Sequence, residues 1–266
     1  MRATIADPLQ AEVISAALDK PARFKLALAA RCESTNTQLL DAVQQGAPSG
    51  SVVACEEQTA GRGRRGRSWL SAPGDSLTFS LLWRFAAGLP PPAGLSLATG
   101  VAVARALEGA GAAGVRLKWP NDILADGAKL GGILIETVTA GGRHIAVIGL
   151  GLNVRLPRDI AEAVDVRAGA LESVMPCAPS RNLLLAALLN ALATMLDEFE
   201  RAGFGAFAAE WASRHAHGGQ VVRILADDVQ TVEGRCAGVD VDGALLLDTA
   251  TGVRRIVSGD VSLRPA

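Results

Sequence analysis

The chain has 266 residues, 49% of them apolar, and a formal net charge of −1. This length and apolar content predict a folded protein with a buried core and room for a second small domain, and they exclude intrinsic disorder. The near-zero charge argues against a broad basic surface that holds nucleic acid non-specifically. The cysteines form no CxxC pair and lie near no histidine cluster, which argues against a zinc site or a disulfide framework: they are Cys32, Cys55, Cys177 and Cys236.

No membrane attachment is expected from the sequence. The first residues include acidic side chains and Pro8 and lack a continuous apolar core, so we expect no signal peptide. The most apolar window, at 183–196, is interrupted by Asn190 and Thr194 and is bounded by charged residues. This window therefore predicts a buried or amphipathic helix rather than a membrane span.

The first half of the chain predicts helices and strands in alternation. Residues 11–18 have a helical pattern, and residues 24–29 form a strand-like run. Ser34 begins a cluster of N-cap residues ahead of apolar positions from Leu39 onward, which predicts a capped helix that ends at Gly46. The segments that follow are a buried strand at 51–55, a glycine- and arginine-rich loop at 61–68, a strand at 77–83 and an apolar helix at 95–107.

The second half continues with strands at 115–119, 133–138 and 145–150. Ser180 is expected to cap a long helix that ends near Arg201, where Gly203 follows, and a further helix is predicted at about 204–214. Beyond His217 the pattern changes to short strands separated by turn signals, which predicts a small all-β barrel with strands at 221–225, 231–239, 244–247 and 254–257. We therefore expect two domains, at 1–217 and 218–266.

The loop at 61–68 contains the pattern GxGxxG, but its context excludes a dinucleotide-binding fold. That fold needs a helix directly after the loop, whereas Pro73, Gly74 and a strand follow here. The loop also has four arginines within seven residues, and guanidinium groups bind phosphate and carboxylate bidentately. One interpretation is a mobile loop that becomes ordered on a polyphosphate. The other is a solvated basic loop or a nucleic-acid patch, and the loop alone does not decide between them.

A second group of residues surrounds a turn between two apolar runs. The sequence KWPND at 118–122 is typical of a tight turn. A structural role in this turn explains the presence of Asn121 as well as a functional role does. Asp122 and Lys129 lie on either side of a short connection, where we expect them to pair. Two glycines follow Lys129 closely and leave space for a ligand. Lys129 is therefore expected at the edge of a pocket that takes an anionic substrate.

Two further features carry little functional signal on their own. The segment GLGLN at 149–153 is most simply a buried strand that ends in a tight turn. The histidines share no spacing that suits a metal site, so we expect no metal at His144, His215 or His217.

Taken together, several segments resemble the biotin–protein ligase family, in its short form without an N-terminal DNA-binding domain. In chain order they are ESTN at 33–36, EQTA at 57–60 followed by GRGRRGRSW at 61–69, KWPNDI at 118–123, KLGGILIE at 129–136 and GLGLNV at 149–154. The resemblance implies an α+β fold. In that fold a mixed sheet with packed helices forms a class II synthetase-like catalytic domain, and an SH3-like β-barrel follows it.

The resemblance also implies a two-step reaction. The biotin carboxylate attacks the α-phosphate of ATP, with Mg²⁺ bound mainly through the ATP phosphates, and biotinyl-5′-AMP and pyrophosphate form. A lysine of the biotin carboxyl carrier domain of a carboxylase then attacks the mixed anhydride. This chemistry needs no side-chain nucleophile, in agreement with the lack of a Ser/His/Asp or Cys/His pattern.

Residue roles are implied at the positions that match the family. Catalysis is expected from Lys129 and Arg64, with Asp122 orienting Lys129. Biotin contacts are expected from Ser34, Thr35, Asn36, Gln58, Arg62, Gly63, Arg64, Lys129 and Gly132. ATP contacts are expected from Arg64, Arg67, Trp69, Asn121, Lys129 and Asn153.

Two other functions compete with this one. A lipoate–protein ligase-like acyl ligase shares the fold and the adenylate chemistry, but GRGRRGR and KWPND match the biotin branch. A nucleic-acid-binding module that uses the arginine-rich loop is disfavoured by the neutral net charge. About 30 residues precede the match, too few for a winged helix-turn-helix, so we expect no specific DNA binding. We expect a cytoplasmic enzyme, and a homodimer is left open.

Overall fold

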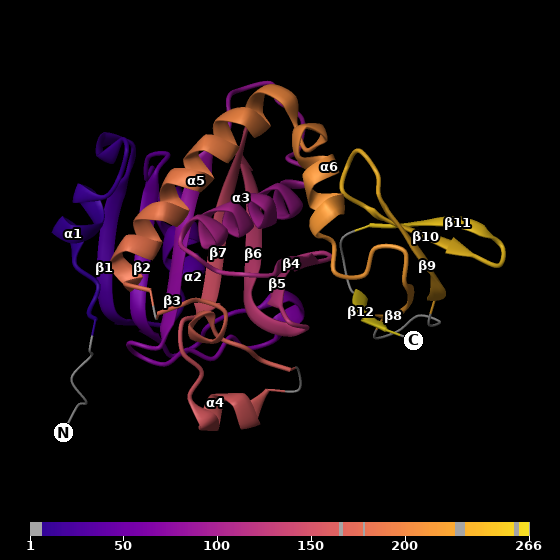
Figure 1. Cartoon of the computed structure of the whole chain (residues 1–266). Coiled ribbons are helices and arrows are strands. Elements are labelled where there is room, and N and C mark those ends of the chain that lie inside the picture. Colours follow the sequence, from indigo (N-terminus) through magenta and orange to yellow (C-terminus); the bar gives the residue numbers. More distant parts are fainter. Residues whose placement is uncertain (1–6, 165–166, 178, 227–231, 258–260, 266) are drawn as a thin grey trace.

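Two β-sheets organise the chain (Figure 1). The computed structural model describes residues 7–164, 167–177, 179–226, 232–257 and 261–265. Within these residues the larger sheet has seven strands in the order β1-β2-β3-β7-β6-β5-β4, and the smaller has five in the order β11-β10-β9-β8-β12. Helices pack on the larger sheet (Figure 1), so the predicted α+β class with a small all-β unit is confirmed.

The larger sheet is mixed because β1 and β2 run parallel, whereas its other neighbouring strands are antiparallel. The central strands β3 and β7 are buried along most of their length, and their buried side chains are largely apolar. The strands are β1 (Lys25–Cys32), β2 (Ser51–Gln58), β3 (Ser76–Arg84), β4 (Val115–Lys118), β5 (Asp122–Ala125), β6 (Ala128–Ala140) and β7 (Arg143–Asn153).

Helices cover both faces of this sheet, and the alternation of side chains along β3 assigns each face its layer. Leu77, Phe79 and Leu81 belong to the main core, whereas Leu82 packs in a smaller cluster with Leu39 of α2. The main core lies under the other large helices (Figure 1). The helices are α1 (Ala11–Ala16), α2 (Thr35–Gln44), α3 (Leu95–Gly109), α5 (Arg181–Ala202) and α6 (Gly205–Arg214).

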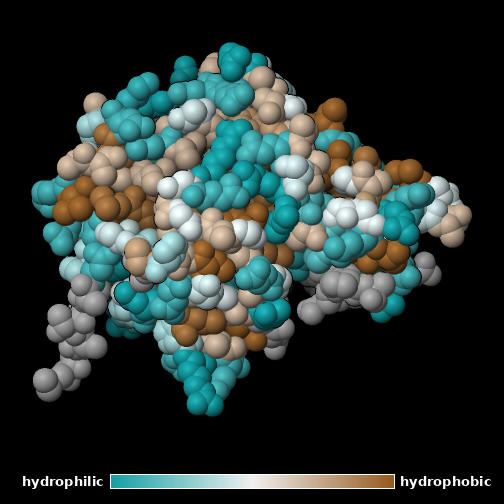
Figure 2. All heavy atoms as spheres, viewed as in Figure 1, coloured by the Kyte–Doolittle hydropathy of each residue, from teal (hydrophilic) through white to brown (hydrophobic). Residues whose placement is uncertain are grey.

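Helix α5 is long and apolar, and it is part of the core. By length and composition alone it qualifies as a membrane span, yet 61% of its most apolar window is buried inside the protein. Leu185, Leu188 and Leu192 are fully buried. Among the described residues of the face in Figure 2, hydrophilic side chains are interspersed with scattered apolar groups. The sequence prediction of a buried helix at 183–196 is therefore confirmed.

The smaller sheet is entirely antiparallel in its described residues. It contacts the larger sheet at the turn after β4, where Trp119 Nε1 donates to the Gly243 carbonyl at 3.0 Å. His215 lies at the same junction, and its ring centre is 4.4 Å from that of Trp211. Burial lowers the pKa of His215 to about 4, so the ring is neutral near pH 7. The strands are β8 (Val221–Ala226), β9 (Val232–Val239), β10 (Leu245–Thr249), β11 (Gly252–Ile256) and β12 (Val261–Pro265).

Several elements differ from the sequence prediction. Strand β5 was expected as a connection, because its four residues are too few to show a periodic pattern. Helix α4 (Arg158–Ala163) and strand β12 were not predicted. Ser34 accepts a hydrogen bond from the Thr37 amide as a cap should, whereas Ser180 occupies the N-cap position without a side-chain bond. Thr231, the predicted start of β9, lies outside the described residues.

A buried ion pair joins the start of α5 to β2. Arg181 Nη1 lies 2.6 Å from Glu56 Oε2, and the Arg181 side chain is 1% exposed. Glu56 Oε1 also accepts from the Leu9 amide at 2.7 Å, and the Arg181 amide donates to the Asp7 carboxylate at 2.6 Å. One pair of charges therefore fixes the N-terminal segment, α5 and β2 together. Breaking such a pair leaves an uncompensated buried charge.

We therefore expect Arg181→Met to lower the free energy of unfolding by about 3 kcal/mol. The matched control is Arg158→Met, because Arg158 pairs with Glu162 at 2.8 Å but its side chain is 91% exposed. This control should change stability by less than about 1 kcal/mol. Urea unfolding of the three proteins measures both values. Equal stability of Arg181→Met and the wild type would mean that the buried pair contributes nothing net.

Candidate functional site

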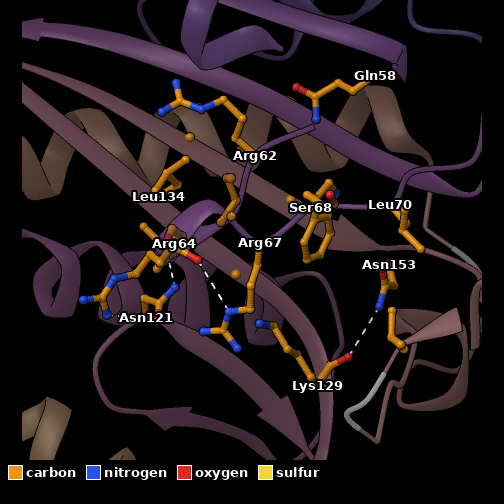
Figure 3. A pocket seen from close by; sticks show the side chains of 18 of the residues that line it. Gln58, Arg62, Arg64, Arg67, Ser68, Leu70, Asn121, Lys129, Leu134 and Asn153 are labelled. Carbon is orange, nitrogen blue, oxygen red and sulfur yellow. Dashed lines mark hydrogen bonds between the residues drawn. The ribbon is translucent and has the colours of Figure 1, made fainter. Parts of the chain in front are cut away.

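One cavity of about 460 Å³ brings the predicted site residues together (Figure 3). It lies between the start of α2, the loop at 61–70, the turn before β5 and the facing strands β6 and β7. Residues from every predicted motif line it: Ser34, Thr35, Asn36, Gln58, Arg62, Gly63, Arg64, Arg67, Trp69, Asn121, Asp122, Lys129, Gly132 and Asn153. Figure 3 shows Gln58 at one end of the cavity and Lys129 at the other.

The end near Gln58 is polar and deeply buried. Thr35 and Asn36 open helix α2 and are 4% and 3% exposed. Gln58 Oε1 accepts from the Thr35 amide at 2.8 Å and lies 3.2 Å from the Thr35 hydroxyl oxygen. Ser80 on β3 reaches both helix residues, at 2.7 Å from Thr35 Oγ1 and 2.6 Å from Asn36 Oδ1. The hydrogen bonds hold these groups in fixed positions, as is needed to recognise a small polar ring.

The glycines at 149–153 give this end its shape. A Cβ on Gly149 would lie 2.1 Å from Asn36 Oδ1, and a Cβ on Gly151 would lie 2.4 Å from the Trp69 ring. Both distances are far inside van der Waals contact, so only glycine admits these side chains against β7. The buried strand predicted at 149–153 is therefore present, and it also provides the surface against which two cavity residues pack.

The opposite end is cationic. Lys129 Nζ lies 2.6 Å from Asp122 Oδ1, as the sequence predicted, and the two side chains are 24% and 19% exposed. Arg64 Nη1 donates to Asn121 Oδ1 at 3.4 Å, and Asn121 in turn donates to the Ile133 carbonyl at 2.9 Å. Among the described residues that line the cavity, Asp122 is the only carboxylate, against Lys129 and three arginines. This balance favours an anionic ligand.

The arginine-rich loop folds back on itself. The Gly63 amide donates to the Arg67 carbonyl at 2.7 Å, and residues 64–66 form a short 3-10 turn in which Arg65 has φ 62°. Arg62 Nη2 lies 2.8 Å from Glu136 Oε1 on β6, which ties the loop to the sheet. In Figure 3, Arg64 and Arg67 lie on the Lys129 side of the cavity.

Sequence reasoning missed an apolar wall on one side of the cavity. The wall consists of Leu156, Ile160, Ala163, Val164 and Ala168, from α4 and its flanks. The signal was present in the sequence, because positions 156, 160, 163 and 164 have the spacing of one helix face. An apolar wall beside a cationic end suits a ligand that joins a flat ring to an anion.

Burial raises the pKa of two cysteine thiols, Cys32 and Cys236, and so disfavours their thiolate forms. Burial raises the pKa of the Cys32 thiol, at the end of β1, to about 12, so it stays protonated and poorly nucleophilic near neutral pH. Within the part of the chain that the structure describes, no group of three or more His, Cys, Asp or Glu side chains is placed to hold a metal ion.

The chain is similar to known proteins over most of its length. Residues 28–153 match the model of the Biotin/lipoate A/B protein ligase family, and residues 217–264 match the Biotin protein ligase C terminal domain. The Escherichia coli bifunctional ligase/repressor BirA is 36% identical over 88% of this chain and 72% of its own length. The Mycobacterium tuberculosis biotin–[acetyl-CoA-carboxylase] ligase is 35% identical over 89% of this chain and 88% of its own. The solved structure of the Aquifex aeolicus biotin protein ligase with biotin and ATP has a TM-score of 0.76 and 29% identity, covering 91% of this chain and 99% of that one.

The Asn36 side chain occupies the space that a Cβ on Gly149 would need. We therefore expect Gly149→Ala to destabilise the protein by about 1–3 kcal/mol, the usual cost of overpacking. Thermal unfolding should show a Tm lower by about 2–12 °C. Gly205→Ala is the matched control, since a Cβ there meets nothing within 4 Å, and it should leave Tm unchanged or slightly raised. A normal Tm for Gly149→Ala would show that Asn36 is free to move aside.

Proposed function

This chain belongs to the biotin/lipoate A/B protein ligase family, and from that premise we propose how its cavity performs ATP-dependent ligation of biotin to protein. The match to the C-terminal domain of biotin protein ligases favours biotin over lipoate as the substrate. The observation that carries the proposal is one cavity with a fixed polar end and a cationic end. Biotin offers the complementary pair of groups, a polar ureido ring and a carboxylate.

The polar end is proposed to bind the biotin ring. Ser34, Thr35, Asn36 and Gln58 would contact the ureido group, since their polar atoms converge on this end of the cavity. Gly132 would offer backbone contact, because nothing lies closer to its absent Cβ than Lys129 at 3.5 Å. With the ring held there, the biotin carboxylate would extend toward Lys129. Arg62 and Gly63 of the loop would lie over the aliphatic chain of biotin, which joins the ring to the carboxylate.

The cationic end is proposed to bind ATP. Lys129, Arg64 and Arg67 supply positive charge to the phosphates, and Asn121 holds Arg64 in place. Trp69 and the apolar wall at 156–168 supply a surface for the adenine ring. Asn153 donates to the Gly169 carbonyl at 2.9 Å and thereby holds that wall against the end of β7.

In the first step a carboxylate oxygen of biotin attacks the α-phosphorus of ATP, and the bond to the β-phosphate oxygen breaks to release pyrophosphate. Two anions must meet, and Lys129 and Arg64 offset their repulsion and stabilise the charge that builds on the α-phosphate. Asp122, at 2.6 Å, keeps the Lys129 ammonium in position. In the second step the amine of the acceptor lysine attacks the acyl carbon, and AMP leaves.

Magnesium fits this site as an ion that arrives with the nucleotide. Asp122 is the only carboxylate among the described lining residues, and Mg²⁺ in nucleotide sites commonly uses one or two carboxylates together with phosphate oxygens. Asp122 would hold it beside the phosphates. When bound, the ion would neutralise phosphate charge and help pyrophosphate leave.

The acceptor is proposed to be the carrier domain of a biotin-dependent carboxylase, because the similar Mycobacterium tuberculosis protein is a biotin–[acetyl-CoA-carboxylase] ligase. A cytoplasmic location and the lack of specific DNA binding remain predictions, and a homodimer remains open. We also propose the domain boundary at 217–218, supported by the start of the C-terminal match at residue 217 and by the separate second sheet.

Incubation with biotin, ATP, Mg²⁺ and a biotin carboxyl carrier domain tests the activity. We expect the mass of the carrier to rise by one biotinyl group, with pyrophosphate and AMP released. Lipoate in place of biotin should give no product. A carrier labelled by lipoate and left unmodified by biotin would instead assign the chain to the lipoate branch of its family.

Lys129→Ala should lower the rate of biotinyl-AMP formation about a hundredfold or more, because one such electrostatic contact commonly contributes that much. Lys25→Ala is the control, since Lys25 is exposed at the start of β1 and is not among the residues that line the cavity. Pyrophosphate release in single turnover measures both. A rate for Lys129→Ala within threefold of the wild type would remove Lys129 from the mechanism.

A further inference from the structure

Glu136 on β6 links the arginine-rich loop to the polar end of the cavity, although it does not itself line the cavity. Its two carboxylate oxygens have different partners. Oε1 accepts from Arg62 Nη2 at 2.8 Å, and Oε2 accepts from Asn36 Nδ2 at 2.9 Å and from Arg62 Nη1 at 3.3 Å. One charge therefore holds a loop residue and a helix residue at the same time.

The contact with Glu136, the shorter of two contacts made by the Asn36 NH₂ group, also determines which way the Asn36 amide faces. A carboxylate only accepts hydrogen bonds, so the Asn36 NH₂ group must face Glu136, and it donates to the Leu134 carbonyl as well, at 3.2 Å. The amide oxygen then faces Ser80, 2.6 Å away. Because an amide oxygen cannot donate, Ser80 must give its proton to Asn36.

The orientation of Asn36 also determines the hydrogen-bonding role of Thr35 at the polar end of the cavity. With the Ser80 proton committed to Asn36, the 2.7 Å contact between Ser80 and Thr35 requires the Thr35 hydroxyl to donate to Ser80, in preference to Gln58 Oε1 at the longer distance of 3.2 Å. The Thr35 hydroxyl then keeps only acceptor capacity. Thr35 lines the cavity, so it presents an acceptor to a bound ligand. An acceptor at this position matches the N–H of a ureido ring.

We propose that Glu136 is a positioning residue for biotin binding: its carboxylate sets the orientation of Asn36, and through Ser80 that of Thr35, while it holds Arg62 of the loop. This inference deepens the proposed function, because it rests on the biotin ring occupying the polar end. The loop and the ring site are then coupled through one side chain.

Glu136→Gln should weaken biotin binding and leave ATP binding unchanged. The introduced amide has a single acceptor oxygen for the donors of Asn36 and Arg62, and its own NH₂ group faces them. We expect the Kd for biotin to rise about tenfold and the Kd for ATP to stay within twofold, measured by calorimetry on the full chain. Glu233→Gln is the matched control, since Glu233 pairs with Arg223 at 3.1 Å on the smaller sheet. Its Kd for biotin should stay within twofold of the wild type.

Asn36→Asp gives a sharper test, because it should reverse the sign of the Glu136→Gln effect. The substitution places a second carboxylate where Asn36 Nδ2 now lies 2.9 Å from Glu136, and two carboxylates cannot share such a site without large cost. We expect this single variant to raise the Kd for biotin about a hundredfold. When Glu136→Gln is added to Asn36→Asp, the new amide at position 136 can donate to the new carboxylate at position 36. The Kd for biotin of the double variant should therefore be about tenfold lower than that of Asn36→Asp alone. A residue needed only for folding would show losses in both backgrounds.

Arg62→Ala completes the experiment and does not depend on Asn36→Asp folding. If Glu136 acts partly through Arg62, this variant should raise the Kd for biotin about fivefold in the wild type and less than twofold in the Glu136→Gln background. Losses that multiply, or a Kd for Glu136→Gln within twofold of the wild type, overturn the inference. The proposed function is judged separately, since it fails only when the wild type forms no biotinyl-AMP.

Discussion

The cavity depends on a strip of glycine between two long antiparallel strands. On β6 and β7, Gly132 pairs directly with Gly151, and Leu134 pairs with Gly149, so the floor of the cavity is largely backbone. Glycine inside a strand costs about 0.5–1 kcal/mol relative to alanine. Buried neighbours such as Ile133, Ile148 and Leu150 on the same ladder offset that cost. The sheet can therefore admit ligands and the side chains of Asn36 and Trp69 against its own backbone.

Positive charge at the site is held in place by individual partners. Arg62 pairs with Glu136, Lys129 pairs with Asp122, and Arg64 contacts Asn121. These partners offset the mutual repulsion of the cationic side chains and hold them near one another before an anion is bound. An anion that enters the cavity therefore meets hydrogen-bonding groups that are already held in place, so its binding needs little reorganisation. The loop and the apolar wall of Leu156, Ile160, Ala163, Val164 and Ala168 line the same cavity.

The smaller sheet is also connected to this site. Trp119 donates a hydrogen bond to the Gly243 carbonyl, and Trp119 lies in the same turn as Asn121 and Asp122. A Cβ on Gly243 would lie 2.9 Å from the Gly94 Cα, so the turn at 240–243 packs closely against the start of α3. The geometry of the cationic end is thus supported by residues more than a hundred positions away in the chain.

The sequence by itself determined the features that depend on neighbouring residues. These include the capped helix after Ser34, the buried strands, the turn at 118–122, the pairing of Asp122 with Lys129 and the ordered motifs that resemble biotin ligases. Tertiary structure alone decided the rest. Strand β5 exists because β4 and β6 pair with it, and only the fold places the apolar side of α4 against the cavity. The motif at 129–136 predicted no role for Glu136. Its partners Arg62 and Asn36 lie 74 and 100 residues away, and no local pattern encodes contacts at that separation.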